Sequence, residues 1–175
     1  MCGLFGVLST KKLNDRKKFL SCLNLLKHRG PDAQGTFFDE NIYFGHNRLS
    51  IIDVSKKANQ PMYTKANDYT LIYNGELYNY QILKKQLIKK GYKFFSNSDT
   101  EVVLNSIREW GVNIIKKFDG MFAFALWNIK KKKLLVARDR YGIKPLYYSF
   151  YKDCFVFSSE IKSIKKYLNV ELKLD

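Results

Sequence analysis

Short apolar runs alternate with turn residues along most of the chain, and stretches of helical spacing lie between them. The runs Leu4 to Leu8 and Met121 to Trp127 are apolar at nearly every position, as in strands that are buried on both faces. The pattern predicts eight strands, at residues 2–8, 36–38, 41–46, 69–73, 121–127, 134–137, 146–148 and 154–157. It predicts four helices, at residues 14–27, 80–90, 98 onward and 159–168.

Local signals place the boundaries of these elements. We expect Asn14 to cap the first helix, and Gly91 to end the second. Ser98 to Glu101 has the spacing of a capping box at the start of the third. Residues 28–35 are rich in Gly and Pro and predict a shaped loop, and residues 74–76 are expected to break the strand before them.

The predicted helices fall between groups of strands. This order predicts an α/β fold of the α+β kind, in which two mainly antiparallel sheets pack on each other with helices outside. A chain of 175 residues, 46% of them hydrophobic, can bury one sizeable core. The strands at 146–148 and 154–157 are expected to pair as a hairpin, and their aromatic residues to pack in this core and along the sheet.

Composition and charge restrict the partners and the cellular location expected for this chain. The net charge is +15, but the excess is carried mainly by lysines in pairs and short runs, and arginine, the usual reader of bases, is rare. This disfavours specific nucleic-acid binding. Three cysteines form an odd, sparse set, which predicts reduced thiols and a cytoplasmic location. The sequence shows no apolar run long enough to span a bilayer, so no membrane contact is expected.

Cys2 is the first candidate for chemistry. If Met1 is removed, one residue carries both a thiol and a free α-amine, and the amine can take the thiol proton near neutral pH. The apolar run that follows would hold this terminus in place. The alternative is an ordinary buried cysteine at the start of a strand. A Cys–His scheme is disfavoured, because neither His28 nor His46 needs to approach Cys2.

Four further residues complete a candidate site. Asn74 and Gly75 can direct a side-chain and a main-chain N–H at one oxygen, as an oxyanion hole does; the alternative is an Asn-Gly hairpin turn. Arg48 can bind a carboxylate in a bidentate pair, or else form a structural ion pair. Asp99 can receive a cation, or else belong only to the helix cap. No spacing typical of a metal site is present, and Arg138 to Arg140 is expected to form a structural charge network.

Nine stretches, in order over about residues 2–165, resemble the glutaminase domain of class II, N-terminal-nucleophile glutamine amidotransferases. The resemblance is strongest to the N-terminal half of glutamine-hydrolysing asparagine synthetase. The stretches are 1–3, 28–32, 48–51, 60–62, 73–79, 98–101, 119–123, 138–147 and 158–160.

The resemblance implies a four-layer α/β/β/α fold for a domain at residues 2–175. It implies hydrolysis of L-glutamine to glutamate and ammonia through a thioester on Cys2, with Asn74 and Gly75 as oxyanion hole. Substrate would be held by Arg48, which takes the α-carboxylate with help from Leu49, Ser50, Ile51 and Ile52, and by Glu76 and Asp99, which take the α-ammonium.

The synthetase domain of the full-length family is not found in this sequence, and its Ser-Gly-Gly-x-Asp-Ser loop is missing. We therefore expect no cofactor here, with ATP and Mg belonging to a synthetase domain or subunit that receives the ammonia for asparagine synthesis from aspartate. Amidation of another carboxylate, such as a sugar acid, and a glutamine-sensing domain without catalysis stay open, as does a homodimer.

Overall fold

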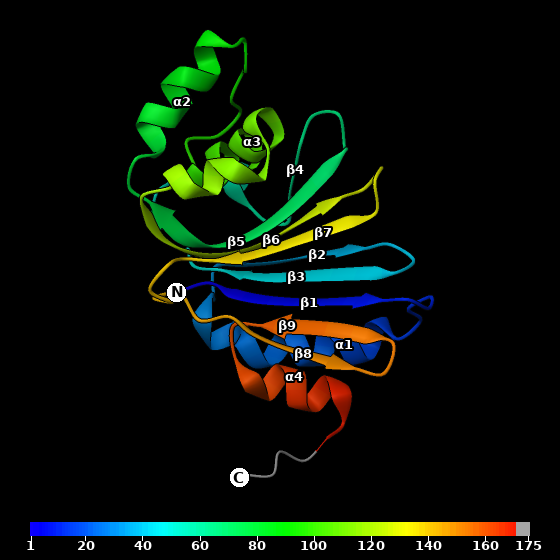
Figure 1. Cartoon of the computed structure of the whole chain (residues 1–175). Helices are drawn as coiled ribbons and strands as arrows, with labels where there is room; N and C mark the ends of the chain where they lie inside the picture. The colour runs from blue at the N-terminus through cyan, green and yellow to red at the C-terminus, as the bar shows by residue number, and fades with distance from the viewer. Residues whose placement is uncertain (171–175) are drawn as a thin grey trace.

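The computed structural model describes residues 1–170, which fold into four layers (Figure 1). One antiparallel sheet has the strand order β2 (Ala33–Phe38), β3 (Ile42–Arg48), β1 (Gly3–Ser9), β9 (Cys154–Ser158) and β8 (Tyr147–Tyr151). The other has the order β4 (Met62–Tyr63), β5 (Tyr69–Leu77), β6 (Gly120–Asn128) and β7 (Lys133–Arg138). The predicted α/β/β/α sandwich with two antiparallel sheets is confirmed.

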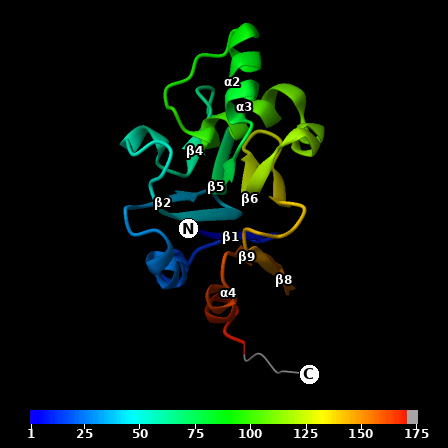
Figure 2. The same cartoon turned by 90° about the vertical axis from the view of Figure 1, so that its left-hand side faces the viewer.

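Helices cover the outer face of each sheet, as Figures 1 and 2 show from two sides. The helices α2 (Tyr80–Lys89) and α3 (Asp99–Trp110) pack on the sheet that contains β5, and α1 (Arg16–Leu23) and α4 (Ile161–Leu168) pack on the sheet that contains β1. Short 3-10 helices occur at Asn24–Arg29, Lys56–Ala58 and Val112–Lys117. None of the helices in residues 1–170 is long and apolar enough to cross a membrane.

The core lies in three apolar layers, one between the two sheets and one beneath each pair of helices. Between the sheets, Leu4 and Phe44 from one side meet Ile72 and Trp127 from the other, and all four are at most 1% exposed. Both faces of β1 and β6 are covered in this arrangement, which explains why their sequences are continuously apolar. The apolar layer between the sheets also fixes the positions of the strand ends that form the site described below.

The first helix differs from the prediction. Asp15, and not Asn14, is its N-cap, because the Asp15 carboxylate accepts the main-chain N–H of Lys18 at 2.8 Å. The α-helix ends at Leu23, and the chain continues as the 3-10 helix Asn24–Arg29. The expected loop at 28–35 is therefore shorter, since β2 already begins at Ala33.

The predicted break at residues 74–76 was wrong. Strand β5 continues to Leu77, because β6 pairs with it along its whole length and places Asn74 opposite Ala123 and Gly75 opposite Phe122. The capping box is half formed. The Ser98 hydroxyl accepts the N–H of Thr100, whereas the Glu101 carboxylate accepts the main-chain N–H groups of residues 95 and 96 in the preceding loop.

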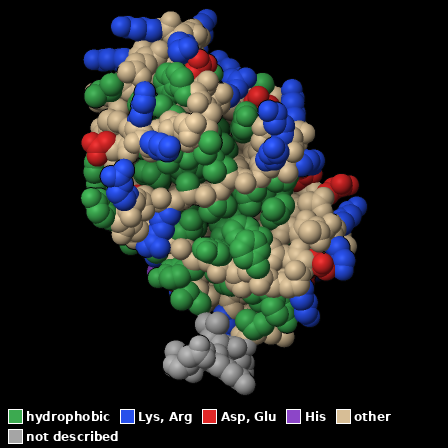
Figure 3. Space-filling view, in the orientation of Figure 1, with side chains coloured by type: hydrophobic (Ala, Val, Ile, Leu, Met, Phe, Trp, Pro, Cys, Tyr) green, Lys and Arg blue, Asp and Glu red, His purple; other side chains and the backbone are tan. Residues whose placement is uncertain are grey.

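The hairpin of β8 and β9 forms as predicted, but its aromatic residues do not all pack inside. Phe157 is buried, while Tyr148 is 65% exposed and Phe150 is 76% exposed on the edge strand β8. Figure 3 shows hydrophobic side chains gathered near the middle of the face seen in Figure 1, with lysine and arginine side chains around them. The residues described also contain a ninth strand, the two-residue β4, which the pattern did not predict.

Candidate active site

A cavity of about 240 Å³ opens where strands from both sheets end, next to the N-terminus. The N-terminus lies at the end of β1, at one end of the sandwich (Figures 1 and 2). Every predicted site residue except Ser50 lines this cavity, so the fold brings together positions from residue 2 to residue 99. They are Cys2, Arg48, Leu49, Ile51, Ile52, Asn74, Gly75, Glu76 and Asp99.

Cys2 lies immediately before β1, whose first paired residue is Gly3. Its sulfur is 3.4 Å from the main-chain nitrogen of Leu49 and 3.6 Å from the Leu49 carbonyl oxygen. Burial raises the pKa of the Cys2 thiol, and the Leu49 N–H and the charges of Arg48 and Lys144 oppose that rise. The thiol needs a base to ionise near neutral pH, because burial favours its protonated form.

Asn74 and Gly75 lie side by side in β5 at the cavity wall. The Asn74 side chain is 2% exposed, and its amide nitrogen has no hydrogen-bond partner among the residues described. A buried N–H group without a partner is costly, so this donor is available for an acceptor atom in the cavity. A Cβ added to Gly75 would lie 2.6 Å from the Met121 carbonyl oxygen and 2.6 Å from the Tyr73 ring, so only glycine fits here.

Arg48 ends β3 and is 6% exposed. Its guanidinium donates to the Ser55 carbonyl and the Asn59 side chain, each at 2.9 Å, and to the Asp53 carbonyl. These acceptors are neutral, and within residues 1–170 no carboxylate lies in ion-pair distance of Arg48. The alternative of a structural ion pair is therefore wrong, and the buried charge remains available to an anion in the cavity.

Asp99, in the first turn of α3, is 4% exposed. One of its carboxylate oxygens accepts the main-chain N–H of Leu77 at 2.9 Å and the hydroxyl of Tyr73 at 3.1 Å. Asp99 therefore joins α3 to β5 and does more than cap its own helix. Burial raises the pKa of Asp99 despite these donors, and a cation bound in the cavity would lower it again. Glu76, at the end of β5, is a second carboxylate in the cavity wall.

The residues that follow Arg48 do not all line the cavity. Leu49, Ile51 and Ile52 line the cavity, whereas the main-chain N–H of Ser50 is directed to the Asp32 carboxylate at 2.7 Å. This hydrogen bond from Ser50 to Asp32 therefore anchors the loop that follows β3. Ser50 is not among the residues that line the cavity and its N–H is engaged by Asp32, so its role in substrate binding stays a prediction.

The two histidines act as hydrogen-bonding groups, as the sequence indicated. His46 is fully buried in β3, and its Nε2 lies 3.0 Å from the Tyr73 carbonyl oxygen. Burial lowers the pKa of His46 to about 3, so the ring is neutral at ordinary pH. His28 contacts the Glu160 carboxylate at 2.8 Å. Neither ring serves as a base for Cys2 in this arrangement.

The predicted charge network at Arg138 to Arg140 has a different form. The Asp139 carboxylate accepts main-chain N–H groups from residues 122, 141, 143 and 144, and it makes no ion pair with its arginine neighbours in the described chain. Burial raises the pKa of Asp139, but these donors outweigh it and the net shift is downward. Asp139 thus shapes the loop that carries Lys144 to the cavity.

The residues of the cavity wall that sequence reasoning did not assign to the site include Gln60, Tyr73 and Lys144. Gln60 holds β5 through both of its amide atoms, since it donates to the Tyr73 carbonyl at 3.1 Å and accepts the Tyr73 N–H at 2.6 Å. Lys144 is 8% exposed and brings a buried positive charge to the site. Both Gln60 and Lys144 lie in stretches that carry the family resemblance, which was the available signal.

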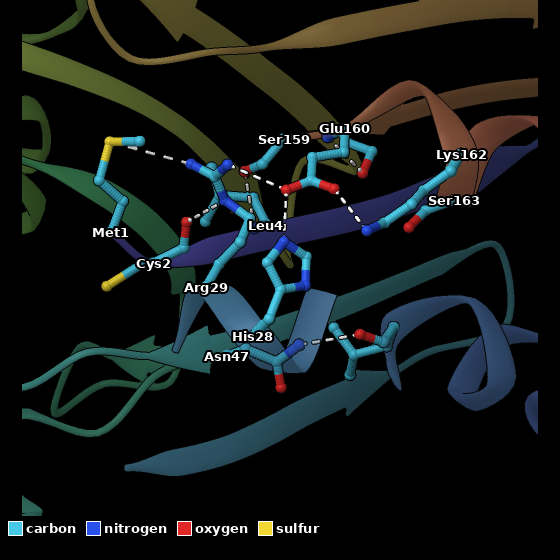
Figure 4. A network of polar contacts seen from close by, with 12 residues as sticks. Met1, Cys2, Leu4, His28, Arg29, Asn47, Ser159, Glu160, Lys162 and Ser163 are labelled. Carbon is cyan, nitrogen blue, oxygen red and sulfur yellow. Dashed lines mark hydrogen bonds and ion pairs between the residues drawn. The ribbon is translucent and has the colours of Figure 1, made fainter. Parts of the chain in front are cut away.

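The N-terminus is held by a polar network beside the cavity (Figure 4). Arg29 Nε donates to the Cys2 carbonyl oxygen at 3.0 Å, and Arg29 Nη1 lies 3.1 Å from the Glu160 carboxylate. Met1 precedes Cys2 here, is 52% exposed and also borders the cavity. In this form the Cys2 nitrogen belongs to a peptide bond and is no base.

The cavity combines the parts needed to cleave the side-chain amide of an α-amino acid. Its lining groups include a thiol, a buried unpartnered N–H donor, the buried cation Arg48 beside a second one, Lys144, and carboxylates that include Glu76 and Asp99. The thiol can attack a carbonyl carbon, and the donor can stabilise the oxyanion that forms. The cation and the carboxylates match the two charges of a free amino acid.

Comparison with known proteins agrees with this arrangement. Residues 1–175 match the family described as the glutamine amidotransferase domain. The chain belongs to this family. It is 38% identical, over all of its length, to asparagine synthetase [glutamine-hydrolyzing] 3 of Bacillus subtilis, and it covers 29% of that protein. It is 44% identical over 81% of its length to amidase chry2 of Gibberella zeae, and covers 21% of that protein.

The fold is also that of a solved amidotransferase. The structure of glutamine phosphoribosylpyrophosphate amidotransferase from B. subtilis superposes with a TM-score of 0.79, at 24% identity, over 95% of this chain and 43% of that one. The glutamine amidotransferase domain therefore spans less than a third of the curated relatives named above and under half of this structural neighbour. The predicted resemblance and the enzyme class, a glutamine amidotransferase domain, are confirmed.

Proposed function

We propose that this domain hydrolyses L-glutamine to glutamate and ammonia through a thioester on Cys2. After removal of Met1, the Cys2 amine takes the thiol proton, and the sulfur attacks the side-chain amide carbon. The amine then returns the proton to the leaving nitrogen, ammonia departs, and water hydrolyses the thioester to glutamate. The Asn74 side chain and the Gly75 N–H hold the oxyanion of each tetrahedral intermediate.

The observation that carries this proposal is the buried Asn74 amide nitrogen, which has no partner in residues 1–170 and lines the same cavity as Cys2. A merely structural asparagine would use its donors. Arg48 and Asp99, also buried in the cavity wall, supply the positive and negative groups that a free amino acid requires. A glutamine side chain held by both ends would then present its amide to the thiol.

The ammonia is proposed to pass to an ATP-dependent synthetase domain or subunit that converts aspartate to asparagine. The asparagine synthetase relative supports this acceptor, and ATP and Mg would bind in the synthetase part. Another carboxylate stays the alternative acceptor, because a relative that is 44% identical is named an amidase and not an asparagine synthetase. Co-purification of partners, followed by assays with ATP and either aspartate or other carboxylates, distinguishes the two.

The decisive experiment joins mass spectrometry with a glutaminase assay. The intact mass shows whether Met1 is removed, and the processed protein should release glutamate from glutamine. Cys2→Ala should abolish this release, and Cys2→Ser should nearly do so, because a hydroxyl is a much weaker nucleophile at neutral pH. Cys154→Ser is the matched control, since Cys154 lies at the far end of β9, opposite Ser9, and should leave activity unchanged.

Two outcomes would contradict the proposal. Full activity in Cys2→Ala would move the nucleophile elsewhere. Glutamine binding without turnover in the processed protein would indicate a sensing domain, and binding can be measured by calorimetry on the same sample.

A further inference from the structure

The nucleophile of this site lies just outside the sheet that orients it. Pairing between β1 and β3 begins with Gly3 opposite Asn47, and pairing between β1 and β9 begins further on, at Phe5. Cys2 therefore has no ladder hydrogen bond on either side. Terminal residues without such bonds fray, yet the proposed chemistry needs both the amine and the thiol of Cys2 in fixed positions.

Arg29 replaces the missing ladder bond. It lies at the end of the 3-10 helix Asn24–Arg29, and its Nε donates to the Cys2 carbonyl at 3.0 Å. The Arg29 side chain is only 10% exposed, so its guanidinium cannot sample many positions. A single hydrogen bond still allows a flexible side chain to turn, and the orientation of Arg29 must be fixed by a second contact.

Glu160 provides that contact from the other side of β1. Its carboxylate accepts Arg29 Nη1 at 3.1 Å, and Figure 4 shows the arginine held between this carboxylate and the Cys2 carbonyl. Burial raises the pKa of the Glu160 carboxyl, but hydrogen bonds from its three basic partners outweigh this and lower the pKa to about 2. Glu160 is therefore ionised at neutral pH.

The backbone around Glu160 is also fixed to the start of β1. The neighbouring Ser159 bonds Leu4 twice, because its N–H donates to the Leu4 carbonyl and its hydroxyl accepts the Leu4 N–H, both at 2.9 Å. Glu160 precedes α4, and Lys162 in the first turn of that helix holds the second carboxylate oxygen at 2.8 Å. The position of Glu160 relative to Cys2 is therefore determined by the sheet itself.

We propose that Glu160 is a positioning residue for the nucleophile, which acts through Arg29 on the Cys2 carbonyl. This inference rests on the proposed function of Cys2. Loss of Glu160 releases Arg29, lets Cys2 move, and slows the chemical step, while Arg48 and Asp99 continue to hold glutamine. The defect therefore falls on kcat and not on KM.

The test compares Glu160→Ala with Lys162→Ala. Glu160→Ala should lower kcat by about 10- to 100-fold, the scale expected when reacting groups are displaced by about 1 Å, with KM within about twofold of the parent value. Glu160→Gln keeps an acceptor for Arg29 and should regain part of kcat. Lys162→Ala removes another partner of Glu160 that does not contact Cys2, and should resemble the parent protein.

A second measurement follows the thiol without turnover. The rate of Cys2 alkylation by iodoacetamide should rise several-fold in Glu160→Ala, because a looser terminus exposes the buried sulfur, and should be unchanged in Lys162→Ala. Thermal unfolding confirms that each variant is folded. A proportionate change in kcat and KM, or equal effects of the two alanine variants, would refute the role of Glu160. A parent protein without glutaminase activity would refute the proposed function, and the alkylation rates would still decide the inference.

Discussion

The main-chain N–H of Leu49 lies 3.4 Å from the sulfur of Cys2, although 47 residues separate the two in sequence. Leu49 follows Arg48 directly, so one short segment contacts the thiol and carries the buried cation. This sets a fixed spacing between the group that would attack an amide and the group that would hold a carboxylate. Such a fixed spacing would select substrates by the length of their side chain. It would distinguish glutamine from asparagine, whose side chain is one methylene shorter.

Asn74 is expected to act on rate and not on substrate binding. Its amide nitrogen has no partner in the described chain, and it would meet the charge that develops only in the tetrahedral intermediate. Asn74→Ala should lower kcat by on the order of 10²–10³ with little change in KM. Asn74→Asp, of similar size but without the donor, should be equally impaired. Steady-state kinetics decide this, and a change confined to KM would assign Asn74 to ground-state binding.

Arg48 is expected to act on substrate binding. Arg48→Ala should raise KM for glutamine by about 100-fold, the loss expected for a bidentate charge-assisted contact, while kcat at saturation changes far less. Because Arg48 also holds the loop through Asn59, the control is Asn59→Ala, which removes this loop contact and retains the cation. A rise in KM as large in Asn59→Ala as in Arg48→Ala would show that the loop, and not the charge, governs binding.

The layers of the fold were readable from the sequence because strand and helix periods and turn residues are local. The continuation of β5 through Asn74 and Gly75 was not readable. An Asn-Gly pair is a local signal for a hairpin, and only pairing with β6, more than 40 residues away, keeps these residues extended. The exposure of Tyr148 was missed for a related reason, since a local pattern does not show that β8 is an edge strand.

The candidate site was predicted residue by residue through its resemblance to a family, while physical patterns alone left alternatives open. Arg48 could not be separated from a structural ion pair until its neutral partners were known. Gln60 and Lys144 reach the cavity from loops whose positions depend on the packing of both sheets, so spacing along the chain could not place them.

Asp99 should make glutamine binding sensitive to acid. Burial raises its pKa in the free domain, and only the ionised carboxylate attracts an α-ammonium group. KM should therefore rise as pH falls through this raised pKa. Asp99→Asn should show a high KM that no longer depends on pH over the same acidic range. KM measured against pH in both proteins tests this, and an equal pH dependence in Asp99→Asn would exclude Asp99 as the group responsible.

His46, which is not among the residues that line the cavity, should make the folded state less stable at acidic pH. Burial lowers the pKa of His46 from 6.5 to about 3. Between these two pH values the imidazole is protonated in the unfolded chain and neutral in the folded chain. The stability that His46 contributes is complete above pH 6.5 and is lost as pH falls toward 3. At pH 5 the loss is about 2 kcal/mol, from 1.36 kcal/mol per pKa unit. Denaturant unfolding of the parent protein at pH 7 and pH 5 should show it.

The matched variant for this measurement is His46→Gln. Glutamine at position 46 can still donate to the Tyr73 carbonyl but does not titrate, so its unfolding free energy should fall less between pH 7 and pH 5 than that of the parent. The imidazole resonances of His46 provide an independent reading, because they should not titrate above pH 5. A midpoint near 6.5 for that ring would show that His46 is hydrated and that its burial does not control the acid stability of the domain.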